Sequence, residues 1–491
     1  MTGLVEDSSV VAILPELIVL AAALLLMIAD FIVPRQRERF PLLAAAAACV
    51  ALLQSVFMLE GPYSAVFGGA AVVDIWTGAF RIISYLSAML SLLLLMRNRA
   101  GDVGSAWPGD SGELSILILL SSIGVSVMAA SRDLLVTVIA LEIMSLAVYP
   151  IIALPRRKAN QEAAVKYFLM GSVASAIMLF GMSFLFRDVG TTRYMALPQA
   201  DQFKLIGMTL FAMGLFFKMA AVPFHSWLPD VYETTPSQAG GFMAAALKAA
   251  AFAALGRFLV FTLPNEPLTI KIYIALSVAT MLMGNTAALL QTNLGRLWGY
   301  SALAHTGFLL MGIAASAQQR SANGLGAVVV YLFAYVPAAI GIFALLGIGE
   351  REAEIAGRTN QDAGRNLTDL NGLFRRCPAS AVALTILMAS LAGIPPTAGF
   401  WGKLEIFVAS FDAGHLGLLG VALLNSLFAA YYYVRVIREA FTDASYEKGP
   451  VPSGIKYVLV LCSIIILASG ILPDVMMRIA KAAAISLGHS L

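Results

Sequence analysis

Four ionisable side chains lie deep in apolar stretches of the chain. Lys218, Lys248 and Lys403 each interrupt a long hydrophobic run, and Glu142 lies in the run DLLVTVIALEIMSLAVYPIIAL, nine residues after its only acidic companion. A charge near the centre of a bilayer costs from about 2.5 to more than 10 kcal/mol, so each of these groups needs a partner or water. Lysines and carboxylates held in this way can exchange protons. The pattern indicates proton transfer through buried side chains.

Proline interrupts two of these runs close to a lysine. Pro223 follows Lys218 by five residues, and the pair Pro395 and Pro396, with glycines on both sides, precedes Lys403. Proline removes a helical hydrogen bond. Backbone groups that are freed at membrane depth persist only where they face protein or water, so we expect two broken spans that line hydrated cavities. The proline pair also fits a plain loop between two short spans.

Each candidate has an expected role. An ionised Glu142 needs a cation from another helix, and Lys218 is the best-placed candidate. Lys248 lies about halfway along the next span without a carboxylate in its own helix, and we expect it to be the central proton carrier. Lys166 lies close enough to the end of its span to snorkel to the surface. His305 fits a hydrogen-bonded core histidine as well as a proton relay.

The rest of the sequence is typical of an all-α polytopic membrane protein. Of its 491 residues, 59% are hydrophobic and 12% are charged, about half the charged share of an ordinary soluble domain. Apolar runs of about 20 residues alternate with short polar loops, and a helix of this length crosses the hydrocarbon. We predict about fourteen spans, of which the seventh and twelfth are broken. Arg81 and Arg257 lie nearer the ends of their spans and are expected to be interfacial anchors.

Loop charges predict the orientation in the membrane. Most of the loop lysines and arginines fall on one side, together with the clusters at residues 35–39 and 156–158. The positive-inside rule assigns that side to the cytoplasm, so both termini are predicted to be periplasmic. The net charge of +3 is spread over the loops and offers no patch for nucleic acid. The longest loop, Gly349–Pro378, carries no recognisable motif.

A weak internal echo predicts two inverted repeats. In DLLVTVIALE and in RLWGYSALAH, a charged residue is followed nine residues later by an ionisable group, which pairs Glu142 with His305. The two broken spans form a second matching pair. We predict an N-terminal three-helix segment (1–112), a first repeat (113–264), a second repeat (265–442) and a C-terminal helix (443–491).

Four segments resemble signature segments of the antiporter-like subunits of proton-pumping NADH–quinone oxidoreductase, respiratory complex I. They are FKMAAVPFHSWLPDVYETTPS, GGFMAAALKAA, YSALAHTGFLLMG and LAGIPPTAGFWGK. They occur in the right order on the right spans, and the resemblance covers nearly the whole chain. Among these subunits the chain is most similar to subunit N. Subunit M typically has a glutamate in place of Lys403, and we do not expect the long lateral helix that follows the last span of subunit L.

The resemblance implies a fourteen-helix fold with two inverted five-helix repeats and a polar axis along the membrane plane. It implies that Glu142 and Lys218 are a coupling ion pair, that Lys248 is the central carrier, that Lys403 is the terminal lysine and that Lys166 is a further lysine of the sixth span. The chain would pump protons across a bacterial inner membrane, embedded in the lipid bilayer beside homologous subunits. The sites for NADH, FMN, iron–sulfur clusters and quinone would all lie in other subunits, and this chain would hold no cofactor.

Two other functions remain open. A subunit of a multi-subunit cation/proton antiporter would share the fold and the lysines but would have no redox partners. A structural membrane spacer is disfavoured, because it would have no need for so many deeply placed ionisable residues.

Overall fold

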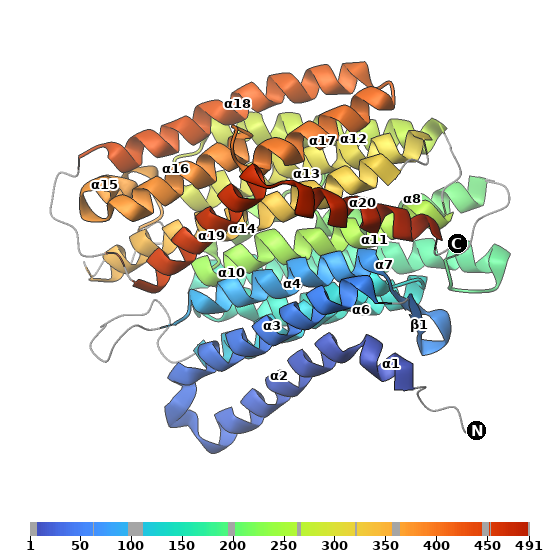
Figure 1. Cartoon of the computed structure of the whole chain (residues 1–491), viewed down its shortest axis with the longest axis horizontal. Coiled ribbons are helices and arrows are strands. Elements are labelled where there is room, and N and C mark those ends of the chain that lie inside the picture. The colour runs from blue at the N-terminus through green and yellow to red at the C-terminus, as the bar shows by residue number, and fades with distance from the viewer. Residues whose placement is uncertain are drawn as a thin grey trace.

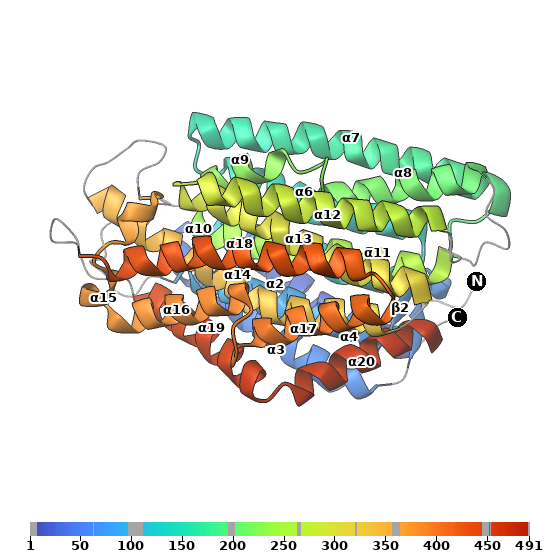
Figure 2. The same cartoon turned by 90° about the horizontal axis from the view of Figure 1, so that it is seen from above.

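The computed structural model is a bundle of long helices whose axes run close to the long axis of the molecule (Figures 1 and 2). It describes residues 7–61, 63–96, 111–194, 202–262, 267–319, 322–355, 364–443, 451 and 453–489. In these ranges, twelve helices are long and apolar enough to cross a membrane. The all-α polytopic fold class is therefore confirmed. The predicted boundary at residues 264 and 265 lies outside the described residues. So do five of the loop cations on which the orientation prediction rests: Arg97, Arg99, Arg320, Arg358 and Lys448.

The region before α5 holds three long helices and a small hairpin that was not predicted. Strands β1 and β2 pair antiparallel, and Ala71 of β2 bridges to Ser131, which precedes α6. Strands of three residues are too short to leave a periodic signal in the sequence. The elements are α1 (Asp7–Ala12), α2 (Leu14–Ile32), η1 (Pro34–Arg39), α3 (Phe40–Phe57), η2 (Met58–Glu60), β1 (Ser64–Val66), η3 (Phe67–Gly69), β2 (Ala71–Val73) and α4 (Ile75–Leu93).

The region of the first predicted repeat ends in one long helix that contains a π turn directly before Lys248. Its elements are α5 (Ser111–Ala130), α6 (Leu134–Ala153), α7 (Lys158–Val189), α8 (Gln202–Lys218), α9 (Trp227–Thr234), α10 (Ser237–Phe242), the π turn η4 (Met243–Leu247) and α11 (Lys248–Thr262).

The region of the second predicted repeat contains two short helical elements, η5 and α15, between its longer helices. Its elements are α12 (Pro267–Leu290), α13 (Leu294–Gln319), α14 (Ala322–Ile355), η5 (Leu367–Leu370), α15 (Leu373–Arg376), α16 (Pro378–Ala392), α17 (Ala398–Asp412) and α18 (Leu416–Phe441).

The C-terminal segment differs from the single helix that was predicted. It forms two helices, α19 (Ser453–Ile471) and α20 (Asp474–His489), which follow one another along the bundle (Figure 1). The interruption falls at Pro473, which lacks the backbone N–H that would continue the helix. It also packs on the second broken span, because Trp401 Nε1 donates to the Gly470 carbonyl at 2.8 Å.

Both predicted interruptions are present, and they share a backbone design. Ala220 follows the end of α8 with φ of 58°, and Gly393 follows the end of α16 with φ of 86°. In each case the next N–H bonds a carbonyl five residues back at 2.9 Å, from Ala221 to Phe216 and from Ile394 to Ala389. Lys218, which we expected inside a span, is the last residue of α8. The proline at position 223 lies in the non-helical segment beyond it.

Two close helix contacts match each other across the predicted repeats. A Cβ added to Gly124 of α5 would lie 2.5 Å from Met144 N of α6, and one added to Gly284 of α12 would lie 2.4 Å from Ala304 N of α13. The glycines are 160 positions apart in the sequence, and so are their partners. Close backbone approach at both places requires glycine. The coincidence supports the predicted relation between the two regions.

The matched contacts change the register of the internal echo. With the same spacing, Glu142 corresponds to Ala302 and not to His305, with which the sequence pattern paired it. Two isolated β-bridges fit this spacing in part. Asp133 bridges to Arg193 and Asn293 bridges to Asn366, and Asp133 and Asn293 are again 160 positions apart. The sequence pattern aligned the charged residues of the two regions, whereas the matched contacts align the helices by their packing.

Candidate functional site

Lys218 is 3% exposed at the end of α8. Its Nζ lies 4.8 Å from the ring centroid of Tyr167, 5.4 Å from that of Phe217 and 5.7 Å from that of Tyr149. It also donates to the Tyr167 hydroxyl at 3.4 Å. Aromatic faces attract cations most strongly where water is excluded. These three rings form an aromatic cage around the ammonium group.

Glu142 does not make the direct ion pair that was expected. It is only partly buried on α6, where it accepts a hydrogen bond from Ser175 Oγ of α7. No ion pair joins it to Lys218 in the part of the chain that the structure describes. Ile139 and Ile143, one turn before it and the next residue after it, are 49% and 40% exposed. Glu142 therefore lies toward a lateral face of the bundle, while aromatic rings contact the lysine.

Lys248 follows the π turn and is 4% exposed. Its Nζ donates to the Ala302 carbonyl of α13 and lies 4.8 Å from the ring centroid and 3.5 Å from the hydroxyl of Tyr335. No carboxylate pairs with it among the described residues. The lysine therefore lies in the interior, where a carbonyl dipole and a tyrosine solvate it.

His305 joins three hydroxyl groups into one hydrogen-bonded chain. Its Nδ1 lies 2.6 Å from the Tyr331 hydroxyl, and its Nε2 lies 2.9 Å from the Tyr433 hydroxyl. Tyr433 continues to Ser301 Oγ at 2.6 Å. Each hydroxyl can both donate and accept, so the chain can pass a proton in either direction. The same bonds would also satisfy a core histidine.

Lys403 is 5% exposed on α17, and its Nζ donates to the Ala392 carbonyl at 2.8 Å. Ala392 is the last residue of α16, so its carbonyl is one of those that the break leaves without a helical partner. The Phe308 ring centroid lies 5.1 Å away. The break therefore supplies the acceptor that solvates this lysine.

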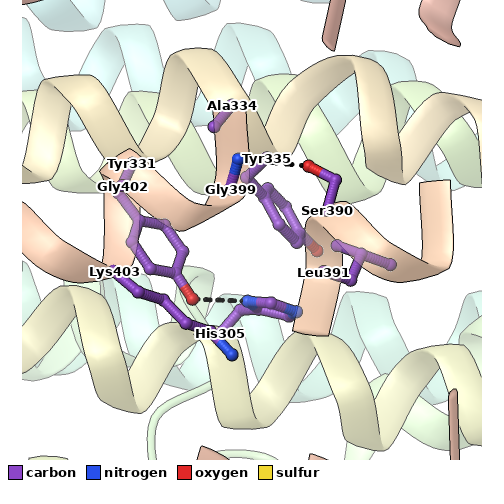
Figure 3. Close-up of a pocket in the computed structure, with 9 residues that line it drawn as sticks. All are labelled: His305, Tyr331, Ala334, Tyr335, Ser390, Leu391, Gly399, Gly402 and Lys403. Carbon is purple, nitrogen blue, oxygen red and sulfur yellow. Dashed lines mark hydrogen bonds between the residues drawn. The ribbon is translucent and has the colours of Figure 1, made fainter. Parts of the chain in front are cut away.

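A small pocket brings Lys403, His305 and the tyrosines together (Figure 3). The cavity has a volume of about 10 Å³, which is enough for about one water molecule. Tyr335, which contacts Lys248 on one side, lines the pocket on the other. Lys248 therefore contacts a tyrosine that lines the same pocket as His305 and Lys403.

The tyrosines were missed in the sequence. Tyr331 and Tyr335 are four residues apart and so share a face of α14, which is a signal that helical spacing could have supplied. Tyr433 follows two other tyrosines and gives no such signal, because its role depends on the approach of α18 to α13.

Lys166 lies apart from the buried lysines. Its side chain is 47% exposed and pairs with Glu162 at 2.8 Å and with Asp230 of α9 at 3.3 Å. The neighbouring residue, Tyr167, contacts Lys218. Lys166 is therefore a surface cation beside the aromatic cage, in line with the expectation that it can reach the surface.

The expectation that Arg81 and Arg257 are interfacial anchors is wrong. Arg81 is 1% exposed and pairs with Glu16 at 2.8 Å, and Arg257 is fully buried and pairs with Asp74 at 2.8 Å. Burial raises the pKa of the Asp74 carboxyl, but the Arg257 guanidinium and hydrogen bonds from Arg257 and Thr77 outweigh it and hold this pKa below its usual value. Both carboxylates come from distant parts of the sequence, so span position alone was misleading.

Metal ligation has no support in the described ranges. There, no group of three or more histidine, cysteine or acidic side chains is placed to hold a metal ion. The site is a set of cations, hydroxyls and one imidazole.

The comparison with protein families matches residues 131–429 to the model described as "NADH:quinone oxidoreductase/Mrp antiporter, TM". This match covers more than half of the chain and includes all of the candidate residues. The chain belongs to that family. Its curated relatives include NADH-quinone oxidoreductase subunit N 1 of Koribacter versatilis, 35% identical over 98% of this chain and 96% of the relative. Subunit N of Desulfovibrio desulfuricans is 38% identical over 94% of each chain.

Solved structures agree with the family. A chain of respiratory complex I from Thermus thermophilus is 30% identical, with a TM-score of 0.79 over 94% of this chain and 98% of the other. A chain of an Mrp complex from a Dietzia species has a TM-score of 0.84 but is only 19% identical, so it supports the fold alone.

Proposed function

We propose that this chain carries protons within the membrane arm of NADH–quinone oxidoreductase along a line from Glu142 and Lys218 through Lys248 and His305 to Lys403. Relatives at 32–38% identity over most of the chain are named as subunit N of this enzyme. The chain is a proton-translocating subunit, and electron transfer from NADH to quinone takes place elsewhere in the complex. Its partners are other membrane subunits, including homologous ones.

The link between Lys248 and Lys403 is the observation that carries the proposal. Each lysine is buried without a carboxylate partner among the described residues. Lys248 contacts Tyr335, and Lys403 lines the same pocket as Tyr335 and His305. A lysine solvated only by dipoles and rings loses its proton far more readily than one in an ion pair. The arrangement therefore supports stepwise transfer, with the pocket water and His305 between the two lysines.

Glu142 is proposed as the entry to this line from a neighbouring subunit. It is partly exposed on a face with exposed isoleucines, and its hydrogen bond from Ser175 shows that its oxygen points to α7. The charge of Glu142 acts on Lys218 without a direct contact between the two side chains. A neighbour that covers this face would desolvate Glu142 and strengthen its pull on Lys218.

The remaining assignments concern organisation. We propose the two inverted repeats at residues 113–264 and 265–442 between the N- and C-terminal segments, which the matched glycine contacts support. We propose a bacterial inner-membrane location with both ends periplasmic, which loop charge supports. The first described helix and the last one end on the same side of the bundle (Figure 1). Labelling of a cysteine near His489 with a membrane-impermeant reagent from each side would test this orientation.

We also propose that this subunit holds no redox cofactor of its own. The candidate site consists of protonatable groups, and no group of three or more histidine, cysteine or acidic side chains in the described ranges is placed to hold a metal ion. The alternative, a subunit of a cation/proton antiporter, rests on the family model, which covers both kinds of protein, and on a structural likeness at 19% identity. Relatives at twice that identity favour NADH–quinone oxidoreductase.

Lys248 provides the test. Lys248→Arg should preserve assembly yet impair turnover, because a guanidinium does not deprotonate in a protein, and Lys248→Ala should impair turnover by removing the relay. Proton pumping and complex yield are measured together in reconstituted vesicles. A role as a mere structural anchor gives the reverse ranking, in which arginine is nearly normal and alanine fails to assemble.

A further inference from the structure

Helix α9, the short half-helix after the first break, sets the position of the aromatic cage around Lys218. Its first residue, Trp227, lies with its ring centroid 4.5 Å from that of Tyr167 and 5.7 Å from that of Phe217. Trp227 Nε1 also donates to the Phe217 carbonyl at 3.2 Å. Tyr167 and Phe217 both contact the Lys218 ammonium. A shift of α9 therefore moves two walls of the cage.

The second-repeat region contacts one side of α9 through α13. Arg296 Nη1 pairs with Asp230 at 3.1 Å and with Glu233 at 2.8 Å, both on α9. Beside it, a Cβ on Gly295 would lie 2.7 Å from the Tyr232 carbonyl, so the glycine is needed for the two helices to approach this closely. His305 lies nine residues further along the same helix as Arg296, which is about 13.5 Å at the helical rise.

The same region binds the C-terminal end of α9 through Arg365. This side chain is 7% exposed and donates to the carbonyls of Tyr232, Glu233 and Thr235. The last carbonyls of a helix have no partner within it, and a cation there also complements the helix dipole. Arg365 pairs in turn with Glu350 at 2.5 Å, and Glu350 lies on α14, which carries Tyr331 and Tyr335.

Besides the contacts of Trp227 with Tyr167 and Phe217, the first-repeat region holds α9 through Asn160 and Lys166. Asn160 Nδ2 donates to the Thr234 carbonyl at 2.7 Å, and Lys166 shares Asp230 with Arg296. The half-helix thus lies between two parts of the molecule. Its C-terminal end is fastened mainly to α13 and α14, the two helices that line the pocket of His305 and Lys403, and its N-terminal end touches the Lys218 cage.

We propose that Arg296 and Arg365 are positioning residues that couple the His305–Lys403 pocket to Lys218 through α9. A change in α13 or α14 moves the two arginines, the arginines move α9, and Trp227 then changes how tightly the cage holds the ammonium. Coupling of this kind is reciprocal, so the charge on Lys218 also biases the second-repeat pocket. The inference rests on the proposed function, because it assigns a link between two of its proton sites.

The test uses the complete complex in native membrane vesicles with Arg296→Gln and Arg365→Gln. Each variant should assemble in normal amount but pump protons about 2- to 30-fold more slowly per complex, the range expected for residues that modulate coupling without touching a ligand. Arg375→Gln is the matched control, because Arg375 pairs with Asp443 at 2.8 Å at the surface, where the side chains are 74% and 63% exposed. It should pump normally.

A purely structural role of the arginines makes a different prediction. It lowers the amount of complex while each assembled complex pumps at the normal rate, and that outcome overturns the inference. If Arg365→Gln does not assemble, Arg365→Lys keeps the charge but loses the fork that reaches several carbonyls, and slow pumping per complex is again expected. Normal pumping by the assembled variants, with Lys248→Arg impaired, overturns this link alone. Normal pumping by Lys248→Arg overturns the proposed function itself.

Discussion

The two broken spans interrupt their helices with the same backbone conformation, but they stabilise their lysines through different contacts. Both place a left-handed residue after the first half-helix, Ala220 in one and Gly393 in the other, and both reuse a carbonyl five residues back. At the first break, aromatic rings surround Lys218, which ends its half-helix. At the second, Lys403 lies on the half-helix that follows and donates to Ala392, a carbonyl freed by the break.

The difference shows that a break in a membrane helix determines where unpaired backbone groups lie, but not whether the nearby lysine binds them. Ring faces respond to small shifts of α9, since the attraction falls off with distance and angle. A backbone carbonyl held by the break is a rigid acceptor. We infer that Lys218 is the adjustable site and Lys403 the fixed one.

The largest expected effect is the loss of either lysine. Lys218→Ala and Lys403→Ala should each lower NADH–quinone activity and pumping together by about 10²- to 10⁴-fold, because a positioned proton-transfer group is removed. Glu142→Gln should act in the same direction by removing the charge that favours protonated Lys218. The rates are measured in vesicles that hold equal amounts of complex. Full activity of a variant at one break would show that this break has no carrier.

The next effect concerns stability and should have opposite signs at the two breaks. Gly393→Ala forces a side chain into left-handed backbone at about 1–2 kcal/mol and places a Cβ 2.7 Å from Lys403 Cδ. Ala220→Gly relieves the same cost at the first break. The midpoint of thermal unfolding of the purified complex should fall for the first variant and rise for the second. A shift in the same direction for both would contradict the shared backbone design.

The smallest effect should come from Tyr167→Phe. This change keeps the ring beside Lys218 and removes only the hydroxyl at 3.4 Å. A single hydrogen bond contributes about 0.5–1.5 kcal/mol, so turnover should change by about 2- to 10-fold. Phe217→Leu removes a ring instead and serves as the comparison, with turnover measured per assembled complex. If Tyr167→Phe impairs turnover more than Lys218→Ala, the hydroxyl is a carrier in its own right.

Much of the site was predictable because membrane burial is recorded locally. A lysine between two runs of apolar residues has few explanations, and a proline beside it marks a break, so Lys218, Lys248, Lys403 and both interruptions followed from the sequence. The partners did not. Each lysine contacts groups from helices far away in the chain, such as Tyr335 for Lys248, and spacing along one helix carries no information about its neighbours.

The sequence by itself determined that the chain is a helical membrane protein, that two of its spans are broken beside a lysine and that Lys218, Lys248 and Lys403 lie inside. These properties depend on the free energy of single residues and short runs in lipid. Only the tertiary structure decided that Glu142 faces sideways, that two supposed anchors are buried ion pairs and that Arg365 closes the end of α9. These features depend on which helices approach one another, and helix packing is set by complementary surfaces that span the whole chain.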